Sequence, residues 1–254
     1  MERKYSIGHA VLWSITAILF LVIIESFHHF GFWVADRIYP SIMAWDPDKV
    51  FIHISIHHIV QMVLALWLIL LIKKVSGLSM SDFGFQKKGF KEGIGKVGIF
   101  FAVWVAVQVI ITVVMINNGS PLPAFLYPDT PLNFWGDMGF QLLLSGPGEE
   151  ILFRALPIPL LLLLGKKAGW KNKTTQYLTA IVTILIFVVG HIGYTLFPPR
   201  IVYYHSMQLL TVVTLGIAYA YFFFKYKNIY LCMILHSAHN MVAVLMVPIF
   251  TAIF

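Results

Sequence analysis

Long apolar runs constrain this chain more than any other feature of its sequence. A helix that crosses the ~30 Å hydrocarbon core of a bilayer needs roughly 20 mostly apolar residues. The sequence contains six such runs, at residues 7–27, 50–72, 97–116, 176–197, 203–224 and 229–250. A further apolar stretch, residues 134–164, is longer than one straight span needs and is interrupted by a Gly-Pro-Gly triplet. We therefore expect an all-α, polytopic integral membrane protein with seven to eight transmembrane helices.

The composition is typical of one membrane domain. Only 11% of the 254 residues are charged, against about 25% in an ordinary soluble domain. The single cysteine, Cys232, excludes an internal disulfide, so helix packing must hold the fold together. No repeat, low-complexity tract or linker divides the chain. We predict a single transmembrane domain over residues 1–254, with a motif-bearing core at about 134–244.

The loops between seven predicted spans differ strongly in positive charge, and this difference sets the expected orientation. Those on the N-terminal side of the membrane hold 14 of the 18 Lys and Arg residues, and those on the other side hold three. Because loops rich in Lys and Arg stay in the cytoplasm, we predict a cytoplasmic N-terminus and a plasma-membrane location. The formal net charge of +7 then reflects contacts with the lipid bilayer, and we expect no nucleic-acid partner.

Three full charges lie inside the apolar stretch SGPGEEILFRALP, residues 145–157. An Asp, Lys or Arg at the centre of a membrane helix costs roughly 2.5 to 3.5 kcal/mol. Glu150 and Arg154 are four residues apart on one helix face, so we expect them to form an ion pair. Glu149 is turned about 100° away and lacks a counter-charge, which suits a general base. The alternative is that all three charges form one packing network.

Two other spans carry polar side chains at helical spacing. In FVVGH, Phe187 precedes His191 by one turn, where its ring can wall one side of a pocket. In LHSAHN, His236 and Asn240 share one face of the last span. Histidine handles protons near neutral pH, and an Asn amide can donate to an oxyanion. A single histidine in a span is more often an interhelical hydrogen bond, but together with Glu149 this set indicates a hydrolytic site.

The order of these motifs, EExxxR, then FxxxH, then HxxxN, each on its own apolar span, resembles the CPBP (Abi) family of intramembrane proteases. This family includes the type II CAAX prenyl endopeptidases and bacterial proteins that process bacteriocins. In this chain the matches read EEILFR (149–154), FVVGH (187–191) and HSAHN (236–240). The resemblance implies an all-helical glutamate-dependent peptidase that uses neither a metal nor another cofactor.

The resemblance also implies roles for individual residues. Glu149 and His191 would activate a water molecule, and Glu149 would later pass the proton to the leaving amine. His236 and Asn240 would stabilise the tetrahedral oxyanion. Structural support would come from Glu150, Arg154 and Phe187. The expected partner is a peptide or protein substrate in or at the membrane, either a CAAX-type prenylated tail or a peptide leader.

The sequence also allows three other kinds of hydrolytic site. A zinc site could form from three histidines of the second span: His53, His57 and His58. However, no HExxH motif occurs and no carboxylate accompanies them in that span. Cys232 and His236 are four residues apart and could form a thiol–imidazole pair. Ser145 could act as a nucleophile, although no GxSG or GxSxG motif surrounds it.

The alternative outside the enzymes is a transporter, channel or scaffold. Such a protein could use Glu149, His191 and His236 as a proton relay, since ionisable residues inside a membrane often mark proton paths. It would have no peptidase activity to lose when His236 or Asn240 is replaced. Cleavage of a peptide therefore discriminates the two classes.

Overall fold

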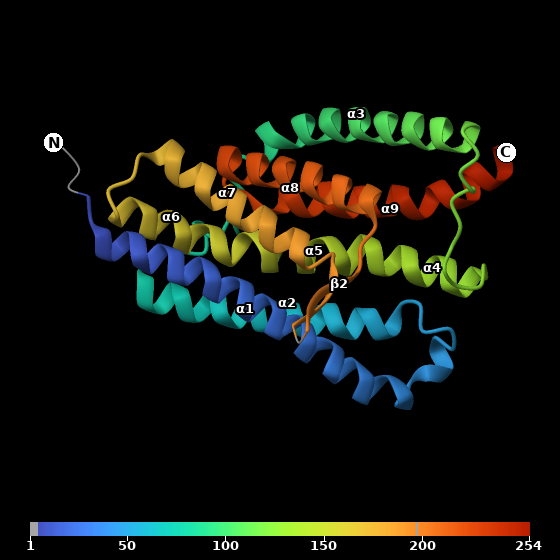
Figure 1. Ribbon diagram of the computed structural model, residues 1–254, viewed down its shortest axis with the longest axis horizontal. Coiled ribbons are helices and arrows are strands. Elements are labelled where there is room, and N and C mark those ends of the chain that lie inside the picture. Colours follow the sequence, from blue (N-terminus) through green and yellow to red (C-terminus); the bar gives the residue numbers. More distant parts are fainter. Residues whose placement is uncertain (1–4, 197) are drawn as a thin grey trace.

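The structure, a computed structural model, describes residues 5–196 and 198–254 and is built almost entirely of helices. Figure 1 shows an elongated bundle in which α1 begins near one end of the long axis and α9 finishes near the other. The elements are α1 (Ile7–Ile38), η1 (Tyr39–Ser41), η2 (Met43–Trp45), α2 (Ile52–Ser76), α3 (Phe90–Asn117), α4 (Pro131–Phe140), η3 (Gln141–Ser145), α5 (Gly146–Glu150), η4 (Ile151–Ala155), α6 (Pro157–Lys167), α7 (Asn172–Val189), β1 (Gly193–Leu196), β2 (Pro199–Tyr203), α8 (Ser206–Tyr226) and α9 (Ile229–Ile253).

In the described part of the chain, six helices are long and apolar enough to cross a membrane. They are α1 with its extension to Ser41, and α2, α3, α7, α8 and α9. This finding confirms the predicted all-α, polytopic membrane class. The total of seven to eight helices stays a prediction, because residues 131–167 are divided into shorter helical pieces.

Residues 131–167 nevertheless follow one helical path through the bundle, from α4 to α6 (Figure 1). Within this path, Pro147 and Pro157 cannot donate a backbone hydrogen bond and crowd the preceding turn. The helix widens before each of them into a π-helical turn, η3 and η4 respectively. These two turns flank α5, which carries Glu149 and Glu150. The expected interruption is therefore a pair of local expansions in a continuous path.

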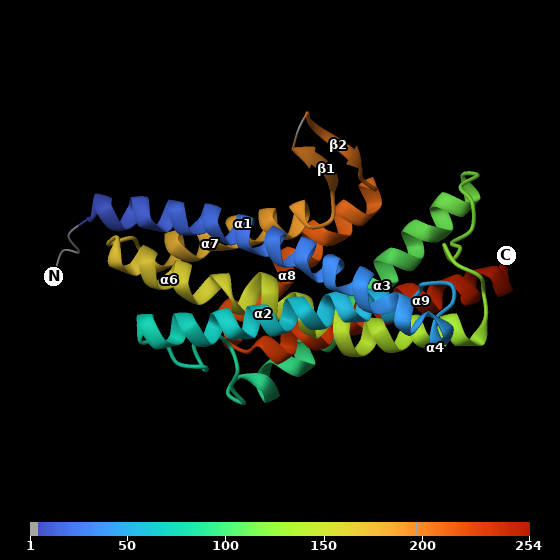
Figure 2. The ribbon, with the colours of Figure 1, turned by 90° about the horizontal axis from the view of Figure 1, so that it is seen from below.

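The fourth predicted span, residues 176–197, is wrong at both ends. Helix α7 begins four residues earlier and ends eight residues earlier, at Val189. The glycines and prolines that follow oppose a helix, and the chain forms an antiparallel hairpin with Gly193 opposite Tyr203. Figure 2 shows this β1–β2 hairpin projecting sideways from the bundle. His191 consequently lies in the turn just beyond α7.

Helix α9 packs directly against α5, and a glycine makes this close approach possible. A Cβ atom on Gly146 would stand 2.7 Å from the backbone nitrogen of Ser237. The surrounding core is apolar, and Leu152, Leu161 and Leu235 are fully buried in it. This packing fixes α5 between α9 and α2, the helices that contribute most of the polar side chains described below.

Helix α3 lies at one edge of the bundle beside α9 (Figure 1) and crosses it obliquely (Figure 2). Its buried residues, Gly93 and Val97, both lie in its first third. There the missing side chain of Gly93 makes room for Leu231 of α9. Toward its other end α3 stands away from α9, and a cavity lies between the helices.

Candidate active site

One buried cluster, here called the ionic core, joins Glu150, Arg154 and His236. The Arg154 guanidinium donates to Glu150 Oε1 at 3.1 Å, and His236 Nδ1 lies 2.9 Å from the same oxygen. Glu150 is 0% exposed and Arg154 is 1% exposed, so the ion pair predicted from their spacing forms inside the protein. The guanidinium also lies 4.0 Å from the centre of the Phe187 ring, a cation–π contact. Glu150 is thus committed to partners within the fold.

Glu149, the adjacent carboxylate, faces a different set of groups. Its Oε1 accepts a hydrogen bond from the Ser145 hydroxyl at 3.2 Å and lies 3.3 Å from His58 Nε2. Its Oε2 lies 3.9 Å from His236 Nε2 and has no hydrogen-bond partner among the described residues. The cations that reach Glu149 are therefore histidines, which are charged only when protonated. This arrangement leaves one carboxylate oxygen available for chemistry.

The hydrogen bonds of His58 determine where its protons lie. His58 Nδ1 is 3.0 Å from the backbone carbonyl oxygen of Ile54. A carbonyl oxygen only accepts, so Nδ1 carries a proton, and in the neutral ring Nε2 then has none. A hydrogen bond between Nε2 and Glu149 requires one further proton, held either by the imidazole or by the carboxyl group. Glu149 and His58 therefore share one exchangeable proton.

His191 is oriented in the same way. Its Nδ1 donates to the carbonyl oxygen of Phe187 at 2.8 Å, which leaves Nε2 as the free nitrogen. The Phe187 ring packs edge-on against two histidine rings. Its centre lies 4.6 Å from the centre of the His191 ring and 6.1 Å from that of the His236 ring. His191 is near enough to Glu149 for their charges to interact, although the described residues show no direct hydrogen bond between the two.

Asn240 is connected to Glu149 through Ser145. The Asn240 amide donates to Ser145 Oγ at 3.0 Å, and Ser145 donates in turn to Glu149. His236, one helical turn earlier on α9, reaches Glu149 and Glu150. The structure thus brings Glu149, His236 and Asn240 into one polar network, with His191 beside it. Their catalytic roles stay predictions.

Two members of this network, His58 and Ser145, have no role in the sequence-based site. The sequence offers His58 as part of the alternative zinc site, or otherwise as an interfacial, packing or substrate-vestibule residue, and it offers Ser145 as an alternative nucleophile. Their contacts with Glu149 differ in kind. Ser145 is four residues away on the same helical path, so helical spacing is a signal that could have found it. His58 is 91 residues away in the chain, and no spacing rule connects it to Glu149.

The three histidines of the alternative zinc site point to different partners. His53 Nε2 lies 2.7 Å from Asp36 Oδ1, and the His57 ring stacks on Phe32 at 3.8 Å. His58 instead faces Glu149, as described above. Among the described residues, no group of three or more His, Cys, Asp and Glu side chains is arranged to hold a metal ion.

The alternative thiol–imidazole pair does not form in this structure. The Cys232 thiol donates to the backbone carbonyl of Tyr219 at 3.4 Å. The His236 ring stacks on the Tyr219 ring at 5.1 Å and is bonded to Glu150 through Nδ1. Cys232 is fully buried and packs as a small side chain in the core.

Comparison with known families identifies the motif-bearing part of the chain. Residues 131–242 match the family model described as "Rce1-like: Type II CAAX prenyl endopeptidase Rce1-like". The match includes all three motifs and confirms the predicted resemblance over this segment. It supports a protease of the CAAX type that is integral to a membrane. Comparisons with curated proteins and with solved structures each found no match.

Proposed function

We propose that this chain, whose residues 131–242 match the Rce1-like family, is a glutamate-dependent intramembrane endopeptidase. Its substrates would be membrane-associated peptides or proteins, either CAAX-type prenylated tails or peptide leaders. The observation that carries this proposal is the contrast within the glutamate pair. Each glutamate has one oxygen, Oε2, without a hydrogen-bond partner among the described residues. Glu150 is paired with the permanent cation Arg154, whereas the ion-pair partners of Glu149 are histidines and its Oε2 lies beside the Nε2 atom of His236.

The hydrolytic step follows from the atoms that remain free. A water molecule that donates to Glu149 Oε2 and to His191 Nε2 is activated for attack on the scissile carbonyl carbon. As the oxygen–carbon bond forms, Glu149 takes the water's proton. It then passes that proton to the leaving nitrogen as the carbon–nitrogen bond breaks. Glu149 is thereby regenerated without any cofactor.

The developing oxyanion needs donors on the other side of the reacting carbon. Asn240 can donate the second proton of its side-chain amide, because only one is used on Ser145. His236 can donate from Nε2 only as an imidazolium, since its Nδ1 proton is directed at Glu150. The contact of His236 Nδ1 with Glu150 fixes the ring, so the ionic core positions His236.

His58 acts in this scheme as a positioning residue for Glu149. Its fixed Nδ1 proton and its contact with Glu149 Oε1 direct the other carboxylate oxygen toward the water. The Ser145 hydroxyl holds the same Oε1 atom from a second direction.

The same proposal includes the orientation in the membrane. The ends of α2, α6 and α8 that carry lysine lie at the end of the bundle where α1 begins (Figure 1). This clustering supports a cytoplasmic N-terminus. The helical path through residues 131–167 would then be the seventh span of a single domain in the plasma membrane.

The decisive test is cleavage of two peptides, a prenylated CAAX peptide and a bacteriocin-leader peptide, by the detergent-purified protein. Wild type should cleave one of them, and Glu149→Gln, matched for folded yield, should not. Glu92→Gln is the matched control, because it removes an exposed carboxylate from the first turn of α3, outside the network. Equal cleavage by Glu149→Gln would contradict its role as the base. Proton flux into liposomes without any peptide cleavage would favour the alternative, a transporter or channel with a proton relay.

Metal independence is tested in the same assay. We expect cleavage to be unchanged by EDTA or phenanthroline, because the proposed step uses side-chain acids and bases alone. A loss of activity that added zinc restores would favour the zinc alternative over the glutamate mechanism.

A further inference from the structure

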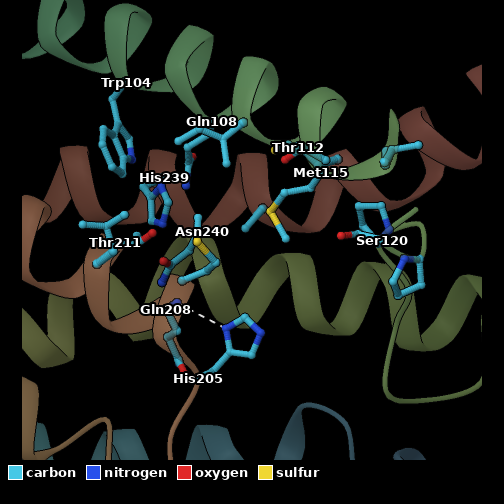
Figure 3. Close-up of a pocket in the computed structure, with 18 residues that line it drawn as sticks. Trp104, Gln108, Thr112, Met115, Ser120, His205, Gln208, Thr211, His239 and Asn240 are labelled. Carbon is cyan, nitrogen blue, oxygen red and sulfur yellow. Dashed lines mark hydrogen bonds between the residues drawn. The ribbon is translucent and has the colours of Figure 1, made fainter. Parts of the chain in front are cut away.

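A cavity of about 700 Å³ lies between α3, α8, α9 and the segment that follows α3 (Figure 3). The cavity forms because α3 packs closely on the bundle only in the first third of the helix, where the buried residues of α3 lie. Beyond that point α3 and α9 separate, and side chains from both helices and from α8 line the space. The cavity is within the size range of sites that bind small ligands or peptide segments.

The chemistry of the lining is mixed but uncharged. Among the described residues that line it, none is an Asp, Glu, Lys or Arg. About half can form hydrogen bonds, including Gln108 and Thr112 from α3, Thr211 from α8 and His239 from α9 (Figure 3). The remainder are apolar, mainly Met, Ile and Pro. Such a lining suits a ligand that is neutral yet rich in hydrogen-bonding groups.

Three buried polar atoms of the lining have no partner among the described residues: Trp104 Nε1, Gln108 Oε1 and His239 Nδ1. An indole N–H only donates, and an amide oxygen only accepts. A ligand that satisfies Trp104 and Gln108 together must therefore offer both an acceptor and a donor. These two residues lie one helical turn apart on the same face of α3. His239, on α9, is only 8% exposed.

We propose that this cavity binds an uncharged, extended peptide segment of the substrate next to the scissile bond. A peptide unit supplies one carbonyl acceptor and one N–H donor, and inside a membrane both need partners. An acyl or prenyl chain supplies neither, so it would leave the three polar atoms unpaired. A free carboxylate would meet no lysine or arginine there. The inference rests on the proposed peptidase function and names the part of the substrate that this region holds.

The position of Asn240 connects the cavity to the reacting groups. Its side chain lines the cavity (Figure 3), and its amide donates to Ser145, which donates to Glu149. A peptide segment in the cavity therefore lies beside one of the proposed oxyanion donors. The segment would be held as part of the binding step, away from the charged groups of the ionic core.

Photo-cross-linking locates the segment directly. The probe is the cleaved peptide of the two tested above, with benzoylphenylalanine beside the scissile bond, bound to Glu149→Gln. We expect adducts on residues 104–115 of α3 and 205–211 of α8. Adducts confined to α1 and α2 would overturn the inference. So would adducts in the cavity from a photoreactive prenyl group but none from the peptide, because an apolar chain would then be the occupant.

Substitutions in the lining give an independent readout. Gln108→Leu keeps the side chain's size but removes its hydrogen bonds, and we expect KM to rise about fivefold to tenfold with kcat unchanged. Ile110→Leu is the matched control, because it is a lipid-facing change on the same helix, 62% exposed, and should leave KM unchanged. Folded yield of both variants is measured by size-exclusion chromatography.

The outcomes separate this inference from the proposed function. If wild type cleaves the peptide and Gln108→Leu has wild-type KM, the cavity inference fails while the peptidase stands. If wild type neither cleaves nor cross-links to either peptide, both fail together. Raised KM in Gln108→Leu, with adducts on α3, supports both.

Discussion

The buried polar groups of the ionic core and those of the cavity beside α3 differ in charge and in pairing. In the ionic core, Glu150, Arg154 and His236 are paired with one another and almost fully buried. In the cavity, the polar atoms of Trp104 and Gln108 are buried without partners and no lining residue described here is charged. An unpaired charge in hydrocarbon costs far more than an unpaired neutral group. Glu150 Oε2 and Arg154 Nη2 also have no hydrogen-bond partner among the described residues, but their opposite charges are paired with each other.

The same contrast appears within one helical turn. Glu150 is tied to a permanent cation, and Glu149 is bordered by histidines and a serine hydroxyl. The two adjacent glutamates thus have different surroundings, because their side chains project from different faces of α5 and contact different helices. One belongs to the fold and the other to the proposed chemistry. The predictions below test that division, from the largest expected effect to the smallest.

Exchanging each glutamate for glutamine should give opposite results. Glu149→Gln should lower kcat by ~10²–10⁴-fold, the usual contribution of a general base, with normal folded yield. Glu150→Gln is the matched change one residue later, and it should lower folded yield because Arg154 loses its counter-charge. Specific activity per folded molecule and yield by size-exclusion chromatography separate the effects. A fully active Glu149→Gln would remove the distinction between the two carboxylates.

Breaking the ionic core from the other side should destabilise the protein strongly. Arg154→Ala leaves Glu150 as an uncompensated buried charge, which costs ~3–5 kcal/mol of unfolding free energy. Arg154→Lys restores a cation, but not the planar guanidinium over Phe187, and should recover part of that loss. Unfolding in mixed micelles measures both variants. Wild-type stability of Arg154→Ala would show that the pair contributes nothing to the fold.

The tight contact between α5 and α9 predicts a smaller loss. Gly146→Ala places a methyl group against the backbone of Ser237 and should destabilise by ~1–3 kcal/mol. Gly139→Ala is the control on α4, because the space around its Cβ position is open and alanine favours a helix. The same unfolding assay applies. Equal stability of the two variants would contradict the close approach of the helices.

Removing the positioning residue should have the smallest effect. His58→Phe keeps a ring of similar size but loses the hydrogen bond to Glu149, and kcat should fall about tenfold. His57→Phe is the control, because the His57 ring is also buried and packs on Phe32 and on the edge of His58, but it has no hydrogen bond to Glu149 among the described residues. The ratio of the two kcat values is the measurement. Identical values for both variants would remove His58 from the mechanism.

The sequence alone determined the features that depend on one helix at a time. The apolar runs predicted the membrane class, and the helical period placed Glu150 with Arg154 and His236 with Asn240. These relations are local, because 3.6 residues per turn fixes which side chains share a face. The motif order also predicted the family that matches residues 131–242.

Only the tertiary structure decided which helices meet. The contact of His58 with Glu149, the early end of α7 and the cavity beside α3 all depend on packing between segments far apart in the chain. In a chain with 59% hydrophobic residues, many helix faces are apolar, so hydrophobicity does not specify the neighbour of each. Close contacts such as that of Gly146 with Ser237 select one arrangement, and that arrangement sets Glu149 apart from Glu150.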